Sequence, residues 1–423
     1  MNTTTLTITQ ASCADDYDPN SMPVAKARAF IHQFLDPVTG VLRVPVRSAL
    51  GRVLAEDVTS PVNVPSHRNS AMDGWAMRGA DLAAGDATLT EIGVSFAGKP
   101  FSGKVAAGQC VRIMTGGVVP EGADTVVMQE RAKANGKSIT FAAGQKTGQN
   151  VRQAGEDLKA GSLALKRGRI VRAAELGLIA SLGIGEVSVY RPLRVAFFST
   201  GDELKSIGTT LGEGEIYDSN RYTLHGMLTR LGCEVLDMGV VRDDPDLIER
   251  AFAQAAASAD VVITSGGVSV GEADFVKSML GKLGEVVFWK IAMKPGRPLA
   301  YGKIGPAHFF GLPGNPVSVM VTFYQFVRSA LLELMGANPV EPVPTFRATC
   351  TSALKKAPGR TEFQRGILAQ APDGALTVKP TGEQGSGILK SMSDANCFII
   401  LGDDVGNVEA GTSVEVQLLE GIL

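Results

Sequence analysis

The sequence predicts a multidomain α/β protein, in which an αβα three-layer domain is joined to smaller β-rich domains. The chain has 423 residues, more than one hydrophobic core usually serves, so two to four domains are expected. From Leu193 onward, apolar runs, glycine turns and amphipathic helical patterns repeat as strand–loop–helix units. Such repeats predict a parallel-type sheet covered by helices. Short alternating apolar runs on both sides of these units predict β-rich domains.

Composition and charge exclude several classes of protein. Apolar residues make up 44%, charged residues 20%, and the formal net charge is −2. A protein that holds long nucleic acid needs a strong basic bias, so no nucleic-acid partner is expected. The five cysteines are scattered without a CxxC pair, which argues against a structural zinc site and fits a reducing compartment. The N-terminus lacks the pattern of a secretory signal, and no window reads as apolar enough to span a membrane. We therefore expect a cytoplasmic protein without a membrane partner.

The N-terminal part reads as a tail followed by a helical connecting region. Residues 1–20 are polar and are expected to form a mobile tail. Within residues 21–59, PVAKARAFIHQFL (23–35) spaces its apolar residues three and four apart and predicts an amphipathic helix. The stretch RSALGRVLAEDV (47–58) looks like a second short helix that leads into a strand.

A β-rich domain interrupts this connecting region. Residues 60–152 are rich in Gly, Val and Thr, with short alternating runs such as GQCVRIMTG, and predict an inserted β-rich domain. Residues 153–191 complete the connecting region, and AAELGLIASLGI (173–184) is expected to be helical.

The αβα domain is expected over residues 192–340 and a β-barrel over residues 341–423. Two helices are predicted in the first, by SNRYTLHGMLTRLG and DPDLIERAFAQAAAS, each between apolar strands. The Pro-rich stretch NPVEPVPTF (338–346) reads as a linker. After it, short strand patterns alternate with turns, which predicts a small all-β domain.

Polar loops follow the successive strands of the αβα domain. Because the carboxyl ends of parallel strands meet at one edge of a sheet, these loops should converge there. Two of them, TSGGVSVGEADF (264–275) and GLPGNPVSV (311–319), are rich in glycine. KIAMKPGRP (290–298) adds cations. The acidic side chains expected at this edge are Asp202, Glu203, Asp218, Asp243, Asp244, Glu272 and Asp274.

This mixture suits a particular kind of ligand. Glycine-rich turns and helix N-termini bind oxyanions, while carboxylates beside a phosphate commonly hold Mg²⁺. The edge therefore fits a phosphate with its metal, or a larger molecule with a charged end and a polar ring. Taken singly, Asp218 and Asp244 could as well be helix N-caps, and the Gly266–Gly267 pair would more often be a plain turn than a binding loop. No HExxH, P-loop, GxGxxG or Ser–His–Asp spacing occurs.

Two polar loops also lie in the inserted domain, HRNSAMDGWAM (67–77) and RIMTGGVVPEGAD (112–124). Together with the edge loops they form an ordered series: NSAMDG, RIMTG, STGDEL, YDSN, SGGVSVGEADF, WKIAMKPGRP and GLPGNPVS. In this series the chain, from about residue 22 onward, resembles the MoeA type of the molybdopterin molybdenumtransferase family, which includes the E domain of gephyrin. It departs from the family pattern at His67–Arg68, Trp75 and Arg297.

The resemblance implies an elongated homodimer whose cleft lies between the αβα domain of one subunit and the inserted domain of the other. The implied reaction is the last step of molybdenum cofactor biosynthesis. Molybdate is inserted into adenylyl-molybdopterin, AMP is released and Mg²⁺ assists. A molybdopterin adenylyltransferase is the implied upstream partner.

The resemblance also implies roles for individual residues. Metal ligation falls to Asp243, Asp274 and Glu203. The catalytic set implied is Asp73, Thr115, Glu203, Asp243, Asp274, Lys290 and Lys294, with Asp73 and Thr115 reaching in from the partner subunit. The set implied to hold pterin, phosphate or molybdate is Gly266, Gly267, Ser269, Lys294, Arg297, Pro313, Pro316, Ser318, Arg365 and Ser386.

Three alternatives stay open at this point. One is a molybdopterin adenylyltransferase, although that activity needs only the αβα domain. Another is a non-catalytic pterin-binding scaffold, which could lose Glu203, Asp243 and Asp274 without penalty. The third is a tungstate-preferring relative, because the two oxyanions are similar in size and charge.

Overall fold

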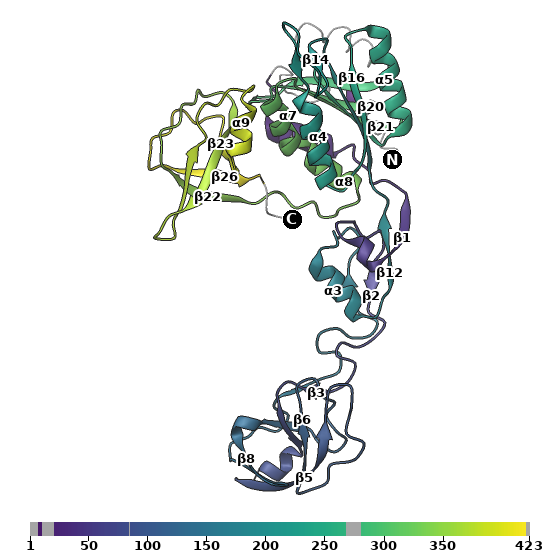
Figure 1. Cartoon of the computed structure of the whole chain (residues 1–423), viewed down its shortest axis with the longest axis vertical. Coiled ribbons are helices and arrows are strands. Elements are labelled where there is room, and N and C mark those ends of the chain that lie inside the picture. The colour runs from purple at the N-terminus through teal and green to yellow at the C-terminus, as the bar shows by residue number, and fades with distance from the viewer. Residues whose placement is uncertain (1–6, 11–20, 84, 268–280, 420–423) are drawn as a thin grey trace, which may run out of the picture.

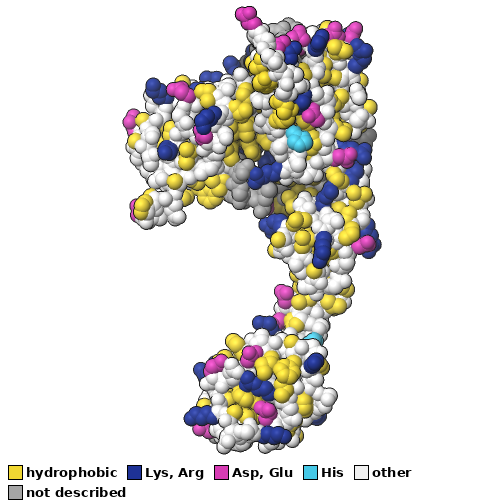
Figure 2. Space-filling view, in the orientation of Figure 1, with side chains coloured by type: hydrophobic (Ala, Val, Ile, Leu, Met, Phe, Trp, Pro, Cys, Tyr) yellow, Lys and Arg dark blue, Asp and Glu magenta, His cyan; other side chains and the backbone are white. Residues whose placement is uncertain are grey.

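The chain forms an elongated molecule with separate lobes (Figure 1). The computed structural model describes residues 7–10, 21–83, 85–267 and 281–419. The αβα part and the C-terminal barrel lie at one end, a narrow connecting region lies in the middle, and the inserted β-rich lobe lies at the other end. Figure 2 shows that the inserted lobe stands apart on a thin neck. The predicted multidomain α/β architecture is confirmed.

The main sheet of the αβα part has six strands in the order β16-β13-β17-β21-β20-β18, and β14 (Leu204–Lys205) and β15 (Ile216–Tyr217) form a separate parallel pair. The first four strands run parallel, whereas β20 is antiparallel to both of its neighbours. The bounds are β13 Arg194–Thr200, β16 Glu234–Val241, β17 Val261–Ser265, β18 Gly284–Lys290, β20 Pro298–Ile304 and β21 Ala307–Leu312. The predicted parallel repeat thus ends in an antiparallel meander.

Helices bury both faces of this sheet. On one face, α5 (Pro245–Ser258) packs Phe252 edge-on against Phe198 and Phe309, with ring centroids 5.1 and 5.4 Å away. On the other face lie α2 (Val24–His32), α4 (Ser219–Arg230) and the long helix Pro316–Leu334. Burial on both faces explains why the strands read as continuous apolar runs.

The long helix corrects one expectation from the sequence. It is built from α7 (Pro316–Thr322), the π-helical η4 (Phe323–Val327) and α8 (Arg328–Leu334). By length and composition it is apolar enough to cross a membrane, so the expectation that no window qualifies was wrong. Its most apolar window is 72% buried inside the protein, which is the pattern of a core helix.

The connecting region pairs β1 (Val41–Pro45) with β12 (Glu186–Tyr190) and contains α3 (Ala173–Ser181). The helix predicted over 47–58 is wrong, because only the 3₁₀ turn η1 (Val46–Ala49) forms there. Gly51 then adopts φ +74°, which ends any helical run. The remaining short pair joins β2 (Val58–Thr59) to β11 (Leu163–Leu165).

The inserted lobe contains a six-stranded sheet in the order β7-β4-β6-β5-β9-β8. Its strands are β4 Gly74–Met77, β5 Ala87–Ser95, β6 Gln109–Ile113, β7 Thr125–Met128, β8 Ala132–Asn135 and β9 Ser138–Phe141. The chain enters and leaves side by side, because β3 (Asn69–Ser70) pairs with β10 (Val151–Arg152).

The C-terminal lobe is a closed barrel of five described strands. They are β22 Thr345–Cys350, β23 Thr361–Gln370, β24 Leu376–Pro380, β25 Cys397–Leu401 and β26 Ser413–Leu418. The pairing of β23 with β25 closes the ring. Strand β19 (Met293–Lys294) leaves the αβα part to pair with β23, and α9 (Leu389–Asp394) lies beside the barrel.

Two smaller expectations concern the tail and the cysteines. Of residues 1–20, the structure describes only 7–10, where the Ile8 N–H donates to the Glu285 carboxylate at 2.9 Å. The four cysteines in the described part of the chain are free.

Candidate functional site

The carboxyl edge of the αβα sheet brings together loops that are far apart in sequence. Strands β13, β16, β17 and β21 are parallel and end at Thr200, Val241, Ser265 and Leu312. Strand β18 also ends on this edge, because it is antiparallel to β20, which is antiparallel to β21. The edge is therefore where the polar loops converge, as the alternation of strands and helices indicated.

A glycine turn sits directly on this edge, after β17. Gly266 has φ +93°, and a Cβ there would lie 2.8 Å from the carbonyl oxygen of Thr200. Its N–H donates to the Leu312 carbonyl at 3.1 Å, and Gly267 follows with φ +68°. Only glycine allows the turn to pass this close to β13.

Asn220 ties this turn to the loop after β21. It lies in the first turn of α4, is 7% exposed, and donates to the Ser265 hydroxyl at 2.7 Å and to the Gly314 carbonyl at 2.6 Å. Asn220 belongs to the YDSN string but was not among the site residues predicted from the sequence. Its position one residue after the serine that follows an N-cap aspartate was the signal available.

Buried polar atoms without a partner collect beside Asn220. The side-chain oxygens Ser199 Oγ, Thr200 Oγ1, Asp218 Oδ2 and Asn220 Oδ1 have no hydrogen-bond partner in the described part of the chain. Buried polar atoms are normally satisfied, so such a group indicates a place for water or ligand. This group of atoms lies near the carboxyl ends of β13 and β17. The chain goes from β13 to β16 on one side and then returns to β17 on the other, so the strand order reverses between β13 and β17. Open α/β sheets bind their ligands at such a reversal point.

Carboxylates crowd the neighbouring loops. The N–H of Asp202 donates to the Asp243 carboxylate and the N–H of Asp243 donates to the Asp202 carboxylate, both at 3.3 Å. Burial raises the pKa of Asp243, and the charges of Asp202 and Glu203 raise it further, against the lowering effect of the Asp202 N–H. A cation would relieve this crowding.

The described residues nevertheless include no group of three His, Cys, Asp or Glu side chains placed to hold a metal ion. Asp274, a third expected metal ligand, lies outside the described residues, as do Ser269 and Glu272. The donor set at Asp243 and Glu203 is hard carboxylate oxygen, which suits Mg²⁺.

The expected cations flank the same edge. Lys290 ends β18 and is half-buried. Lys294 donates to Glu362 of β23 at 3.4 Å, and Glu362 is 3% exposed. This lysine therefore joins the sheet to the barrel. The carbonyl of Arg297 accepts from the Ile291 N–H at 2.6 Å, which closes the loop between β18 and β20.

The start of α7 brings a further group of expected residues to this edge. Pro313 is buried, Pro316 occupies the first helical turn and Ser318 is 4% exposed. The carbonyl of Ser386 accepts from the Val317 N–H at 3.1 Å, so a barrel loop docks on the helix.

Arg365 of β23 is 1% exposed, and its guanidinium is bonded between the barrel wall, α9 and the loop before α9. It donates to the Ser391 hydroxyl and the Gly385 carbonyl at 2.9 Å each. Burial lowers its pKa to about 10. The described contacts therefore place Arg365 behind the loop that carries Ser386.

Asp73 and Thr115 meet in the inserted lobe. The Thr115 N–H and hydroxyl donate to one Asp73 oxygen at 2.7 and 2.8 Å, and the N–H is the main cause of a lowered Asp73 pKa. Arg112 stacks 4.3 Å from the Trp75 ring and is half-buried. Within one chain, this pair lies at the opposite end of the molecule from the αβα edge (Figure 1).

The fold and this edge define the class: a multidomain α/β protein with a polar ligand edge at the carboxyl ends of parallel strands. Three family models cover nearly the whole chain. The MoeA N-terminal region, domains I and II, matches residues 22–183. A probable molybdopterin binding domain matches residues 196–333, and the MoeA C-terminal region, domain IV, matches residues 347–419.

Individual relatives agree. The molybdopterin molybdenumtransferase of Haemophilus influenzae is 48% identical over 379 residues, covering 89% of this chain and 94% of the relative. That of Bacillus subtilis is 34% identical over 388 residues, covering 89% of each. A molybdopterin biosynthesis MoeA protein from Pyrococcus horikoshii has a similar structure, with a TM-score of 0.81 at 29% identity over 94% of this chain and 100% of that one. The chain belongs to the MoeA family of molybdopterin molybdenumtransferases, and it is a transferase.

Proposed function

We propose that the chain inserts molybdate into adenylyl-molybdopterin and releases AMP in the last step of molybdenum cofactor biosynthesis. The observation that carries the proposal is the carboxyl edge. There the Gly266–Gly267 turn, the start of α7 and crowded carboxylates lie at one edge of the same sheet. Water attacks the phosphoanhydride of the adenylate, and AMP leaves as molybdopterin is freed with its own phosphate. Molybdate then exchanges one oxo ligand for the two dithiolene sulfurs, and that oxo leaves as water with the two thiol protons.

Residue roles follow from the chemistry of the edge. Molybdate is a tetrahedral dianion that needs cations and N–H donors, which Lys294, Arg297 and Ser318 would supply. Gly266 and Gly267, with Ser269, would face the pterin or phosphate. Further roles are assigned by position: Lys290 offsets ligand charge, Pro313 and Pro316 shape the α7 turn, and Ser386, held from behind by Arg365, lines the far wall.

Mg²⁺ fits the carboxylates of this edge. Asp243 and Glu203, with Asp274, would hold the ion through oxygen. When bound, it supplies charge neutralisation and polarisation at the phosphoanhydride. The raised pKa of Asp243 supports the assignment, because crowded carboxylates gain most from a cation.

A homodimer would complete the site. Asp73 and Thr115 form an ordered carboxylate–hydroxyl pair that one chain leaves remote from the edge. In an isologous dimer, the inserted lobe of one subunit can reach the αβα edge of the other. This arrangement rests on domains bounded at residues 21–59 with 153–191, 60–152, 192–340 and 341–423. We further propose a cytoplasmic protein that takes its substrate from a molybdopterin adenylyltransferase.

AMP release from purified adenylyl-molybdopterin, with and without molybdate and Mg²⁺, tests the proposal. AMP release that depends on both molybdate and Mg²⁺ would support the proposed reaction. No release with tight pterin binding would indicate a scaffold, and ATP consumption with molybdopterin would indicate an adenylyltransferase. Replacing molybdate by tungstate in the same assay measures oxyanion preference.

A further inference from the structure

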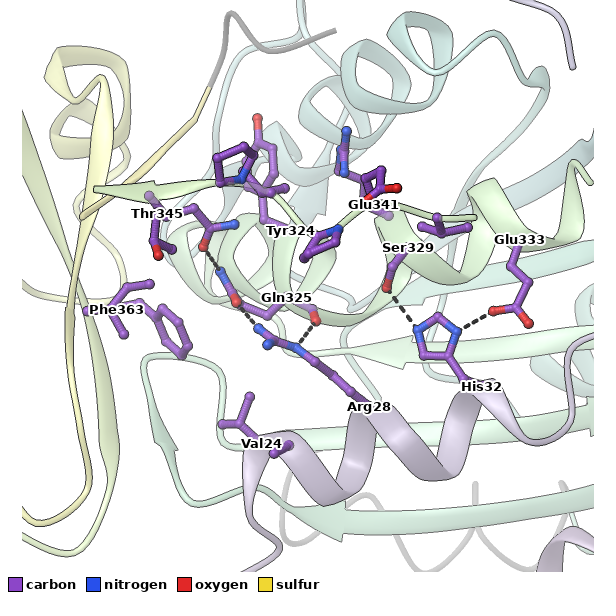
Figure 3. Close-up of a pocket in the computed structure, with 18 of the residues that line it drawn as sticks. Val24, Arg28, His32, Tyr324, Gln325, Ser329, Glu333, Glu341, Thr345 and Phe363 are labelled. Carbon is purple, nitrogen blue, oxygen red and sulfur yellow. Dashed lines mark hydrogen bonds and ion pairs between the residues drawn. The ribbon is translucent and has the colours of Figure 1, made fainter. Parts of the chain in front are cut away.

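Two cavities meet where the long helix faces the barrel, away from the carboxyl edge. The first has a volume of about 1230 Å³ and lies between α2, α8, the Pro-rich linker and the barrel (Figure 3). The second has about 350 Å³ and lies between α4, the long helix and the barrel. Four residues line both: Tyr324, Arg328, Val343 and Gln417.

The first cavity presents two arginines that form no ion pair with any described carboxylate. Within the described part of the chain, Arg28 donates to Gln325, to its carbonyl at 2.7 Å and to its side-chain oxygen, as Figure 3 shows. Arg328 also lines the cavity, and among the described residues no carboxylate lies within 4 Å of either guanidinium. Burial lowers the pKa of both arginines. A partly buried cation without a counter-charge is costly unless an anion joins it.

The acidic groups around this cavity do not supply that anion. Glu333 is paired with His32, whose other ring nitrogen lies 3.2 Å from the Ser329 hydroxyl (Figure 3). The other acidic lining residues, none within 4 Å of Arg28 or Arg328, are Glu341, Asp403 and Glu415. The two guanidiniums therefore remain the sites available to an oxyanion.

The second cavity is lined mainly by apolar side chains, although Thr223, Arg230 and Gln417 also reach it. Its lining includes Met227, Met320, Phe323, Phe398 and Leu418. Figure 2 shows hydrophobic atoms gathered along the seam between the barrel and the αβα part. A volume of this size is at the lower end of the range for small-molecule sites. Arg328 thus stands between a cationic cavity and an apolar groove.

We propose that this junction binds a small amphiphilic anion, with its oxyanion head on Arg328 and Arg28 and its apolar body in the groove. The charge complementarity decides the occupant, because a purely apolar ligand would leave both guanidiniums uncompensated. The site is separate from the carboxyl edge, and neither arginine belongs to the transferase machinery described above.

Fluorescence titration with 8-anilinonaphthalene-1-sulfonate tests the proposal on the full chain. The dye carries a sulfonate on an apolar body, and N-phenyl-1-naphthylamine is its uncharged counterpart. Arg328→Met should weaken dye binding about tenfold, the value of one charge-assisted hydrogen bond. It should leave binding of the uncharged counterpart nearly unchanged. Arg347→Met, an exposed arginine on β22, is the matched control and should change neither.

A second variant tests the groove itself. Met320→Gln should weaken both probes, because Met320 lines only the apolar part. Displacement of the dye by octanoate or by octyl phosphate would support the proposal and identify the head group, and displacement by neither would overturn it. Equal affinity of the dye for wild type and for Arg328→Met would also overturn the proposal. Binding that weakens as protein concentration rises would assign the groove to a second copy of the chain instead. Thermal melts confirm that each variant is folded.

Discussion

Asn220 offers the sharpest test of how the carboxyl edge is held together. Its side-chain amide spans the end of β17 and the loop before α7, through bonds of 2.7 Å to Ser265 and 2.6 Å to Gly314. Asn220→Ala removes both bonds and leaves the buried Ser265 hydroxyl without this partner, whereas Gly314 is an exposed residue whose carbonyl can turn to water. Losing the partner of the buried hydroxyl costs about 1–3 kcal/mol and losing the bond to the exposed Gly314 about 1 kcal/mol, so the unfolding free energy should fall by about 2–4 kcal/mol.

The same change should also lower the reaction rate, because both loops lie at the carboxyl edge where we propose that the ligand binds. A displacement of about 1 Å in positioning groups costs up to about 100-fold in rate, and we expect kcat for AMP release to fall about 10- to 100-fold. Calorimetry of the αβα transition should show a melting temperature lower by about 4–16 °C, at roughly 2–4 °C per kcal/mol.

A matched control separates stability from positioning. Asn407 accepts from the Lys356 N–H at 2.9 Å in the barrel. Asn407→Ala should destabilise the barrel while leaving kcat within about twofold of wild type. If Asn220→Ala lowers the melting temperature as expected but keeps wild-type kcat, the loops are positioned by something other than this asparagine.

The remaining predictions concern charge and assembly. Asp243→Asn should abolish AMP release yet raise stability at neutral pH. The raised folded-state pKa of Asp243 destabilises the fold, and this penalty begins above pH about 3.8 and is complete above the folded-state pKa. Mg²⁺ should raise the melting temperature of wild type more than that of the variant, and equal shifts would argue against this metal site. The hydrogen bond from Arg172 is the main cause that lowers the pKa of Glu175 from 4.5 to about 2. The stability that this carboxylate contributes is therefore present above pH about 4.5 and is lost as the pH falls towards 2. In urea unfolding, Glu175→Gln should lose this dependence of stability on pH, and a dependence unchanged from wild type would refute the pairing. Mixing inactive Asp73→Asn and Asp243→Asn chains should restore about a quarter of wild-type activity, since half the dimers would carry one intact shared site; no recovery after subunit exchange would place both residues in the same subunit's site.

Much of the αβα architecture was readable from local pattern. Helical periodicity located α4 and α5, and glycine after an apolar run located the turn at Gly266. Both signals are local, since a 3.6-residue repeat and a positive φ depend on neighbouring residues only. The helix predicted over residues 47–58 did not form, although the apolar spacing there suits a helix. The pairing of the adjacent β1 with β12 holds the chain in another path, and only the turn η1 forms.

The candidate site was predicted by type but not by contact. Acidic and cationic residues at strand ends were expected at one edge, and the parallel register brings Asp202 and Asp243 together there. The partner of Lys294 is Glu362, 68 positions away on another lobe, and no local pattern indicates that pair. Arg365 likewise reads as an available cation, yet α9 and the loop before it cover the side chain and accept its hydrogen bonds.

The sequence by itself determined the order of elements, the family and the set of residue types at the carboxyl edge, because propensity, periodicity and motif order are written along the chain. Only the tertiary structure decided which of those residues meet. Asn220 became the bridge between two loops, Arg365 became internal, and Asp73 with Thr115 came to lie at the far end of the molecule. Hydrogen bonds and ion pairs act over a few ångströms, so positions distant in sequence acquire partners only when packing brings them within reach.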